Sequence, residues 1–364
     1  MDRHHQRLRP NIMNILDNSK NYRQIDDSDL YGSLTKVGRQ FESGWTVAQF
    51  VSLNFETSKI KNIVFVGMGA SNLSAYIAHS LAPFLLNVPF EIVSNYRLPA
   101  YSDKSTLVIL SSYSGNIEEV LSCASDAKMR SCYIVVITSG GKMASLAETE
   151  HYPLIRLDEK FNPSHCPRAG LGLSLGGVIG LLLRLNPPSQ KHFDVKEIIR
   201  TIERVLDMVS IYKDIAENPA KTLAAKHKGQ GIIIFSANHL EGVGRSTANF
   251  LNESAKTMAE NFSFPDLNHH LLEGFLYPQG LKDQSSIIIL NSSLYPEVLQ
   301  KKIVLTKDIL LQQKYRVTVI KPETSDPVLQ VFESLVFLIS FSYYLSIVNK
   351  VNPATNLWVD YFKT

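Results

Sequence analysis

The sequence predicts an α/β protein made of two tandem units, each a mostly parallel sheet flanked by helices in a flavodoxin-like or Rossmann-like three-layer sandwich. Three observations predict this class. Short runs rich in Val and Ile recur along the chain, the stretches between them are long enough for helices, and the pattern begins again after a proline-containing break. Strands that are apolar throughout indicate a parallel sheet buried on both faces. A chain of 364 residues has room for two such units.

The first unit is predicted at residues 46–187, after a helical lead-in at 1–45. In the lead-in, apolar residues recur at helical spacing, and Gly44 is expected to break the pattern. A buried helix is predicted at 171–185, which is almost wholly apolar, and the Asn-Pro-Pro-Ser break at 186–189 ends the unit. Strands are predicted at residues 63–66, 90–93, 106–110 and 133–137.

The second unit is predicted at residues 229–350, after a connecting segment at 188–228. Apolar residues at helical spacing between charges predict a connecting helix at 195–209. Both units open with an apolar strand followed by small residues, at 67–71 and 236–239, and this weak similarity suggests diverged copies. Strands are predicted at 232–235, 287–290 and 317–320, and a closing helix from about 327 to 348.

Charge and composition exclude several classes of protein. The 37 basic and 34 acidic residues give a net charge of +3 and form no dense basic block, so no nucleic-acid partner is expected. Cys123, Cys132 and Cys166 form no CxxC pair and are interpreted as reduced thiols of a cytoplasmic protein. We expect no signal peptide, because the charged residues at 1–10 are not followed by an apolar region, and no membrane span, because Gln330 and Glu333 interrupt the longest apolar stretch.

A glycine turn, GMGAS at 67–71, follows the first predicted strand and precedes a predicted helix. Free backbone N–H groups and the helix dipole favour an anion there. A dinucleotide site is one alternative, but position 72 is Asn72 in place of a third glycine, and residues 93–95 carry no carboxylate for a ribose. In a second alternative, the glycines serve only a tight turn.

Hydroxylated loops follow two further strands of the first unit. They are SSYSGN at 111–116 and TSGG at 138–141. Ligands of open α/β sheets bind at the carboxyl ends of the strands, and serine hydroxyls with helix-start N–H groups suit phosphate oxygens. Serine-rich loops also serve as plain caps and turns. Three such loops at one sheet edge favour a phosphate site.

These loops, in this order, resemble the first sugar isomerase (SIS) domain, and NPSHCPRA at 162–169 resembles the Pro-Arg-Ala motif of the bifunctional phosphoglucose/phosphomannose isomerase family. The resemblance implies two tandem SIS domains. It implies that Arg168 faces the substrate and stabilises an enediolate, against the alternative that it pairs with Asp158 or Glu159. It also implies a site for phosphate and sugar hydroxyls made of Gly69, Ala70, Ser71, Ser112, Ser114, Asn116, Ile117, Ser139 and Gly140.

The second half carries the proton-transfer groups that the resemblance implies. NESAK at 252–256 resembles the family segment whose glutamate is the isomerisation base, which assigns that role to Glu253. Taken alone, the residues favour a helix glutamate paired with Lys256. PDLNHHLLEGF at 265–275 resembles the segment of the ring-opening histidine, which assigns that role to His269, contributed across a homodimer interface. No other His, Cys or carboxylate stands at i+4 spacing from His269 and His270 on a clear helix face, so no metal is expected.

The C-terminal residues 351–364 resemble the tail that packs at the active site in the family, and this assigns Lys363 to the substrate. A penultimate lysine is otherwise often solvated. Three features depart from the family pattern. Ala70 replaces a glycine, Ile117 replaces a threonine that binds phosphate and is linked to accepting mannose 6-phosphate, and Leu271 removes a carboxylate beside the histidine.

The resemblance implies reversible isomerisation of glucose 6-phosphate and fructose 6-phosphate, with mannose 6-phosphate as a further substrate. The reaction passes through a cis-enediol and needs a base, an acid and a cation, but no cofactor. One alternative is a non-catalytic SIS protein that binds a sugar phosphate for regulation. Another is an isomerase or lyase of a different phosphosugar, such as an amino sugar.

Overall fold

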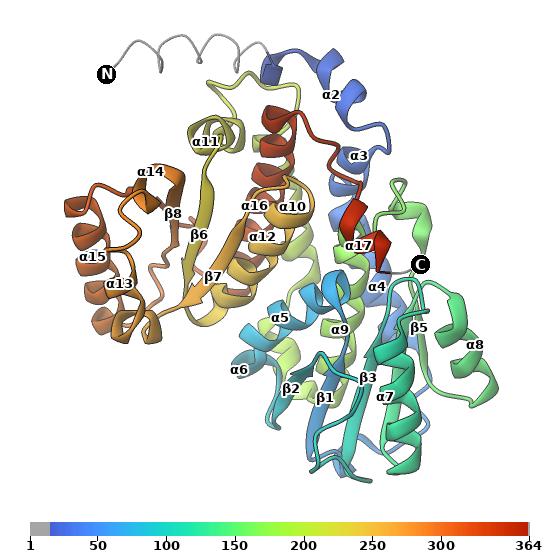
Figure 1. Cartoon of the computed structure of the whole chain (residues 1–364). Helices are drawn as coiled ribbons and strands as arrows, with labels where there is room; N and C mark the ends of the chain where they lie inside the picture. The colour runs from blue at the N-terminus through green and yellow to red at the C-terminus, as the bar shows by residue number, and fades with distance from the viewer. Residues whose placement is uncertain (1–14, 363–364) are drawn as a thin grey trace. The chain divides into compact units, whose positions relative to one another are not determined.

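The computed structural model describes residues 15–362, and the chain divides into two compact units. The first unit is Gly32–Ile199, and the second unit is Met1–Tyr31 together with Arg200–Thr364. Each contains one sheet in which every strand pair is parallel (Figure 1). The predicted fold class is therefore confirmed. The units meet in sequence at residues 31/32 and 199/200, whereas the sequence analysis places the first unit at 46–187.

The sheet of the first unit has the strand order β2-β1-β3-β4-β5. All four predicted strands are present, and the fifth was not predicted because it has only three residues, one of them an arginine. The order reverses direction between β1 and β3, which makes this the switch point where open sheets bind ligands. The strands are β1 (Asn62–Val66), β2 (Phe90–Val93), β3 (Thr106–Ser111), β4 (Tyr133–Thr138) and β5 (Leu154–Arg156).

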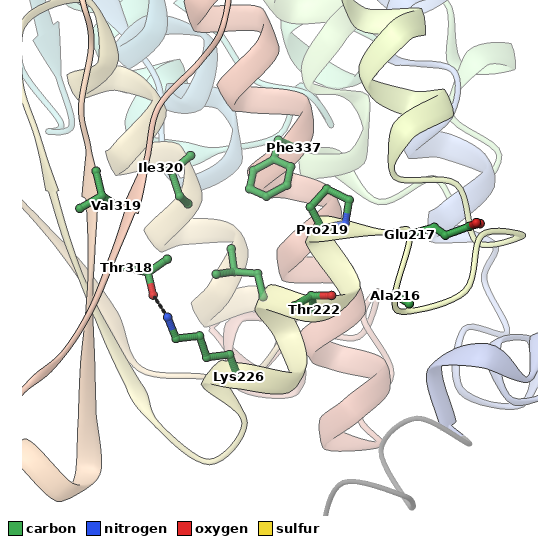
Figure 2. Close-up of a pocket in the computed structure, with 10 residues that line it drawn as sticks. Ala216, Glu217, Pro219, Thr222, Lys226, Thr318, Val319, Ile320 and Phe337 are labelled. Carbon is green, nitrogen blue, oxygen red and sulfur yellow. Dashed lines mark hydrogen bonds between the residues drawn. The ribbon is translucent and has the colours of Figure 1, made fainter.

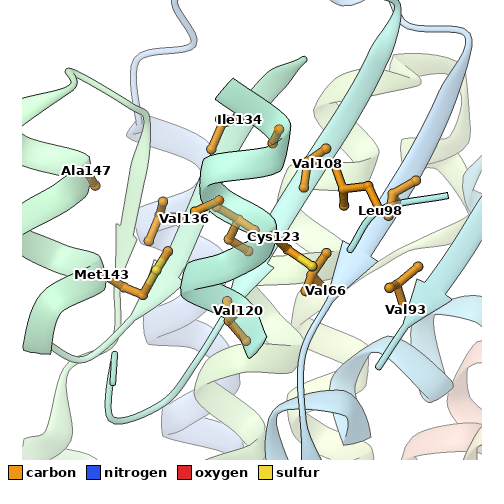
Figure 3. Close-up of a cluster of buried hydrophobic side chains, with 14 residues drawn as sticks. Val66, Val93, Leu98, Val108, Val120, Cys123, Ile134, Val136, Met143 and Ala147 are labelled. Carbon is orange, nitrogen blue, oxygen red and sulfur yellow. The ribbon is translucent and has the colours of Figure 1, made fainter. Parts of the chain in front are cut away.

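Helices cover both faces of this sheet. On one face, α7 and α8 enclose a fully apolar core (Figure 3) made of Val64, Val66, Val93, Leu98, Val108, Leu110, Val120, Cys123, Ala124, Ala127, Ile134, Val136, Met143 and Ala147. The helices of this part of the chain are α3 (Leu30–Leu34), α4 (Val37–Phe50), α5 (Leu73–Ser80), α6 (Ala82–Leu85), α7 (Glu118–Met129), α8 (Gly141–Thr149), α9 (Leu171–Leu185) and α10 (Val195–Met208), which contains the boundary at residue 199.

The helix pair α4 and α9 packs with backbones in close approach. A Cβ atom at Gly44 would lie 2.0 Å from the carbonyl oxygen of Leu173, and one at Gly176 would lie 2.1 Å from that of Phe41. The break expected at Gly44 is therefore wrong, because this glycine lies inside α4 and gives α9 room to approach. The predicted start of the first unit at residue 46 falls within α4 for the same reason.

The sheet of the second unit has the order β7-β6-β8-β9. The three predicted strands are present. The fourth, β7, was not predicted because it is an edge strand with the polar sequence AENFS, in which Ala259 and Asn261 are buried and Glu260 is exposed. The strands are β6 (Gly231–Ser236), β7 (Ala259–Ser263), β8 (Ser285–Leu290) and β9 (Arg316–Ile320).

The longest helix of the second unit, α16 (Pro327–Asn349), confirms the predicted closing helix. It begins at the cap residue Asp326, whose Oδ1 accepts hydrogen bonds from the backbone N–H groups of Val328 and Leu329 at 2.8 and 3.0 Å. The other helices are α2 (Ser19–Ile25), α11 (Pro219–His227), α12 (Glu241–Glu253), α13 (Leu271–Gly274), α14 (Leu281–Gln284), α15 (Glu297–Gln312) and α17 (Leu357–Tyr361).

Two helical segments of the described chain are long and apolar enough to cross a membrane by length and composition alone, Pro167–Leu185 and Pro327–Asn349. Their most apolar windows are 89% and 94% buried inside the fold. Burial of that extent is typical of core helices, which must be apolar on every side.

The second sheet has an open edge at β9. A groove of about 650 Å³ lies between β9 and α11, with Phe337 of α16 at its base (Figure 2). Lys226 of α11 reaches across and donates a hydrogen bond to Thr318 Oγ1 of β9 at 2.8 Å. In the first sheet, a further strand, β5, pairs with the strand at the corresponding position, β4.

Candidate active site

The three hydroxylated loops of the first unit meet at the carboxyl ends of neighbouring strands, as predicted, because β1, β3 and β4 lie side by side in the sheet. Hydrogen bonds join the loops to one another. Ser71 Oγ accepts from the backbone N–H of Tyr113 at 3.2 Å, and the Tyr113 carbonyl accepts from the N–H and the hydroxyl of Ser139 at 3.0 and 2.8 Å. The loops thus form one connected rim at the switch point.

Gly115 is required by the contact between the second and third loops. Its φ is +73°, and a Cβ atom there would lie 1.9 Å from the carbonyl oxygen of Gly140. Gly140 itself has open space where a side chain would point. Close packing of backbone on backbone therefore explains the first of these glycines, and the second leaves an accessible surface.

The predicted phosphate-binding residues divide by exposure. Gly69, Ser114 and Asn116 are exposed, whereas Ala70, Ile117, Ser139 and Gly140 are half-buried. Ser112 is fully buried and its hydroxyl accepts from the Gly115 N–H at 3.1 Å, while Ser71 is 9% exposed and its hydroxyl is used by Tyr113. The structure thus places Ser112 as a residue that shapes the loop and leaves the rim to the others.

Ile117, which departs from the family pattern, has an apolar role in this fold. It is the N-cap residue of α7, with φ −70° and ψ 122° and no side-chain capping bond, and it packs against the core cluster beneath α7. The first turn of α7 contains Glu118 and Glu119, which interact favourably with the positive end of the helix dipole. Compared with a threonine, the isoleucine at this cap lacks a hydroxyl at the rim but adds apolar packing against the core.

Arg168 lies in the 3-10 turn Pro167–Gly170 and is 1% exposed. The turn is held from two sides. Asn162 Nδ2 donates to the Cys166 carbonyl at 3.0 Å, and Gln40 Nε2 donates to the Ala169 carbonyl at 2.9 Å. Of the acids considered as partners of Arg168, Asp158 forms an ion pair with Lys160.

Glu253 is the last residue of α12 and is half-buried. Its Oε2 accepts a hydrogen bond from Asn356 Nδ2 at 3.3 Å. The preceding residue, Asn252, fixes the helix end to β7 by exchanging two hydrogen bonds with the backbone of Ala259, at 2.8 and 3.0 Å. The end of α12 is therefore a firm support for a carboxylate that faces the C-terminal segment.

Lys256 was considered as an ion-pair partner of Glu253. Its Nζ donates to two backbone carbonyls, those of Glu253 at 2.5 Å and Thr355 at 2.6 Å. The lysine thus ties the C-terminal segment to the end of α12. Residues 355 and 356 are thereby held beside Glu253.

His269 ends the 3-10 turn Asp266–His269 and is exposed. Its neighbour His270 lies 3.4 Å from Asp266 through Nε2 and Oδ2. Among residues 15–362, no group of three His, Cys, Asp or Glu side chains is arranged to hold a metal ion. Lys363 lies outside the described residues. The helix before it, α17, exposes Leu357, Trp358 and Tyr361, and the cap residue Phe362 is exposed as well.

The sequence comparisons bear on both halves of the chain. Residues 216–364 match the family model of the bacterial phospho-glucose isomerase C-terminal SIS domain. The chain is also 26% identical over 282 residues to the bifunctional phosphoglucose/phosphomannose isomerase of Caldicellulosiruptor bescii, covering 77% of this chain and 82% of that relative. The chain is therefore similar to the bifunctional phosphoglucose/phosphomannose isomerases over most of its length.

Two further comparisons concern one relative and one solved structure. It is 26% identical over 222 residues to the D-glucosamine-6-phosphate 4-epimerase of Sulfolobus acidocaldarius, covering 60% of this chain and 66% of that relative. In fold it is similar to the crystal structure of a hypothetical protein from Thermus thermophilus, with a TM-score of 0.65 and 16% identity over 99% of this chain and 94% of the other.

The residues predicted for the site fall in both units. The first unit brings together the phosphate-binding candidates and holds Arg168, and the second holds Glu253, His269 and the segment before Lys363. Sequence reasoning missed Tyr113, Asn162 and Asn356. Tyr113 and Asn162 lay inside quoted motifs, but their contact spans 49 positions of sequence and left no signal that a single chain could show.

Proposed function

We propose that this protein reversibly isomerises hexose 6-phosphates between aldose and ketose, with glucose 6-phosphate and fructose 6-phosphate as one pair and mannose 6-phosphate as a further substrate. The observation that carries the proposal is the match of residues 216–364 to a phosphoglucose isomerase domain, because this range contains Glu253 and His269. In this proposal the protein acts in the cytoplasm as a homodimer.

The chemistry follows from the groups that each unit supplies. The rim of the first unit, with Gly69, Ser114, Ser139 and Gly140, binds the phosphate through hydroxyls and backbone N–H groups. Glu253 removes the proton from C2 of the open-chain aldose and delivers it to C1, and a cis-enediol lies between the two steps. The C2 centre loses its configuration in that enediol, which is why glucose and mannose 6-phosphates can share one base.

Two further groups complete the proposed mechanism. His269 acts as acid and base on the ring oxygen and the anomeric hydroxyl, because an imidazole can give and take a proton near neutral pH. Arg168 supplies a permanent positive charge for the enediolate, and a buried guanidinium is most effective because little water screens it.

The test is an isomerase assay of the full chain and of Glu253→Gln. The substitution keeps the shape of the side chain and removes the base, so we expect kcat to fall by about 10³-fold or more, with little change in thermal unfolding. Glu241→Gln is the matched control, since Glu241 is a half-buried glutamate at the other end of the same helix. Its activity is expected to stay within about twofold of wild type.

A second activity is favoured by the relative named D-glucosamine-6-phosphate 4-epimerase and by the isoleucine at the phosphate rim. The same assay therefore includes glucosamine 6-phosphate. Turnover of that sugar alone would replace the first proposal. Binding of sugar phosphates without turnover by the unmutated protein would show a non-catalytic binding protein and would overturn both.

A further inference from the structure

We propose that Tyr113 is a positioning residue that links the phosphate-binding rim to the turn holding Arg168. The inference rests on the proposed function, because it takes the rim as the phosphate site and Arg168 as the cation beside the enediolate. All of its contacts lie within the first unit.

On the rim side, Tyr113 acts through its backbone. Its N–H donates to Ser71 Oγ at 3.2 Å in the loop after β1. Its carbonyl accepts from the N–H and Oγ of Ser139, in the loop after β4, at 3.0 and 2.8 Å. Tyr113 is therefore the residue at which all three rim loops are joined.

On the opposite side, Tyr113 acts through its phenol. The hydroxyl accepts a hydrogen bond from Asn162 Nδ2 at 2.8 Å, and the same nitrogen donates to the Cys166 carbonyl at 3.0 Å, two residues before Arg168. Asn162 is fully buried, and its Oδ1 accepts from Ser164 Oγ at 3.0 Å. The ring also fits against Gly170, where a Cβ atom would lie 2.6 Å from Tyr113 Cε2.

The two sets of contacts separate binding from positioning. Every rim contact uses backbone atoms that a phenylalanine would keep, whereas the contact with Asn162 needs the hydroxyl. Without that hydroxyl, Asn162 keeps a buried N–H that has lost its acceptor, and a buried donor without a partner reorients or costs stability. The support under the Cys166 carbonyl then weakens, and the Arg168 guanidinium is held less accurately where charge develops.

The experiment measures isomerisation by Tyr113→Phe. We expect kcat to fall by about tenfold and KM to stay within about twofold, since a small misplacement of a charged group acts mainly on the transition state. Tyr152→Phe is the control, because Tyr152 is a half-buried tyrosine of the same unit packed beside the core cluster. It is expected to change neither constant. Equal losses in the two variants would overturn the inference.

A double-mutant cycle with Arg168→Lys tests the route of the effect. If Tyr113 acts through Arg168, adding Tyr113→Phe to Arg168→Lys lowers kcat by less than about twofold more. A full additional tenfold loss would mean that the hydroxyl acts elsewhere and would overturn the inference. Thermal unfolding of all four proteins shows whether each is folded.

A binding measurement keeps the inference separate from the proposed function. A five-carbon aldonic acid phosphate carries a carboxylate that mimics the enediolate, and inorganic phosphate occupies the rim alone. Tyr113→Phe should weaken the aldonate phosphate about tenfold and leave inorganic phosphate unchanged. If the two proteins differ in binding as expected but the wild type shows no turnover, the proposed function fails and the positioning role stands. Equal weakening of both ligands would overturn the positioning role.

Discussion

The strand-end loops of the two units share a backbone design but differ in what fills them. After β1, Gly69 has φ +51° and a 3-10 turn leads into α5; after β6, Asn238 has φ +48° and a 3-10 turn leads into α12. In the second unit, however, side chains of the unit itself close the loops. His239 Nε2 and Ser292 Oγ both contact Gln330 Oε1, at 2.9 and 2.6 Å, and the Tyr295 hydroxyl donates to the Ala237 carbonyl at 2.8 Å.

The two units therefore differ in which polar groups are accessible at their strand ends. The rim of the first unit keeps Gly69, Ser114 and Gly141 exposed, so its donors can meet a phosphate. In the second unit, the side chains of His239 and Ser292 are buried and form hydrogen bonds with Gln330. The candidate groups for chemistry there come from the end of α12 and from the turn after β7.

The largest effect is expected from Gly115→Ala, which changes the rim loop that follows β3. The new methyl group would meet the Gly140 carbonyl oxygen, and the φ of +73° is strained for any L-residue. We expect the free energy of unfolding to fall by about 4 kcal/mol and the affinity for inorganic phosphate to fall at least about tenfold. Urea denaturation and calorimetric titration with phosphate measure the two quantities.

Gly140→Ala is the control for Gly115→Ala. Its φ is 178°, an extended conformation open to any residue, and no atom lies within 4 Å of the added methyl position. Its free energy of unfolding should stay within about 0.5 kcal/mol of wild type. If Gly115→Ala bound phosphate as tightly as the wild type, the loops after β3 and β4 could not form the anion site.

A smaller effect is expected on acidification, and it distinguishes the second unit. Burial lowers the pKa of His227 from 6.5 to about 4, with the charges of Lys226 and Arg316 adding to the shift. Burial also lowers the pKa of His239. Between pH 6.5 and about pH 4, residue 227 binds more protons in the unfolded chain than in the folded one. The free energy of unfolding therefore decreases as the pH falls through this range. For His227 the loss is about 3 kcal/mol.

The described histidines of the first unit, His79, His151, His165 and His192, are exposed, whereas His227 and His239 of the second unit are buried. His227→Gln retains a hydrogen-bonding side chain and cannot titrate. Between pH 7 and pH 4, the free energy of unfolding of this variant should decrease by about 3 kcal/mol less than that of the wild type. Identical slopes for both proteins would show that His227 does not control acid stability.

The smallest effect is expected from Ile117→Thr. Threonine is a favourable N-cap residue for α7, but the change removes apolar contact with the core cluster, so the free energy of unfolding should change by less than about 1 kcal/mol. The added hydroxyl is expected to raise the affinity for a sugar phosphate about fivefold. Weaker binding of the sugar phosphate by this variant would place the ligand away from residue 117.

Most of the fold could be predicted from sequence because its buried strands are apolar throughout. The strands that were not predicted are β5, which is short, and β7, an edge strand with a mostly polar sequence. The break expected at Gly44 failed for a tertiary reason, since a glycine inside a helix can serve close packing against another helix.

The candidate site was predictable in its location but not in its details. Which loops meet follows from strand order, but whether a hydroxyl points outward or into its own turn depends on backbone geometry, as Ser112 and Ser114 show. The contacts of Tyr113 with Asn162 and of Glu253 with Asn356 join residues 49 and 103 positions apart. No local pattern encodes such a contact.

The open edge at β9 presents backbone groups with which a strand of another molecule could pair. The Asn291 N–H donates to the Ile320 carbonyl, so Ile320 faces β8, and by alternation Val317 and Val319 direct their N–H and C=O groups outward. Nearby cationic side chains, Arg316 and Lys226, discourage a second strand from adding there. Charge at this edge therefore protects solubility, and neutralising it would favour strand exchange between molecules.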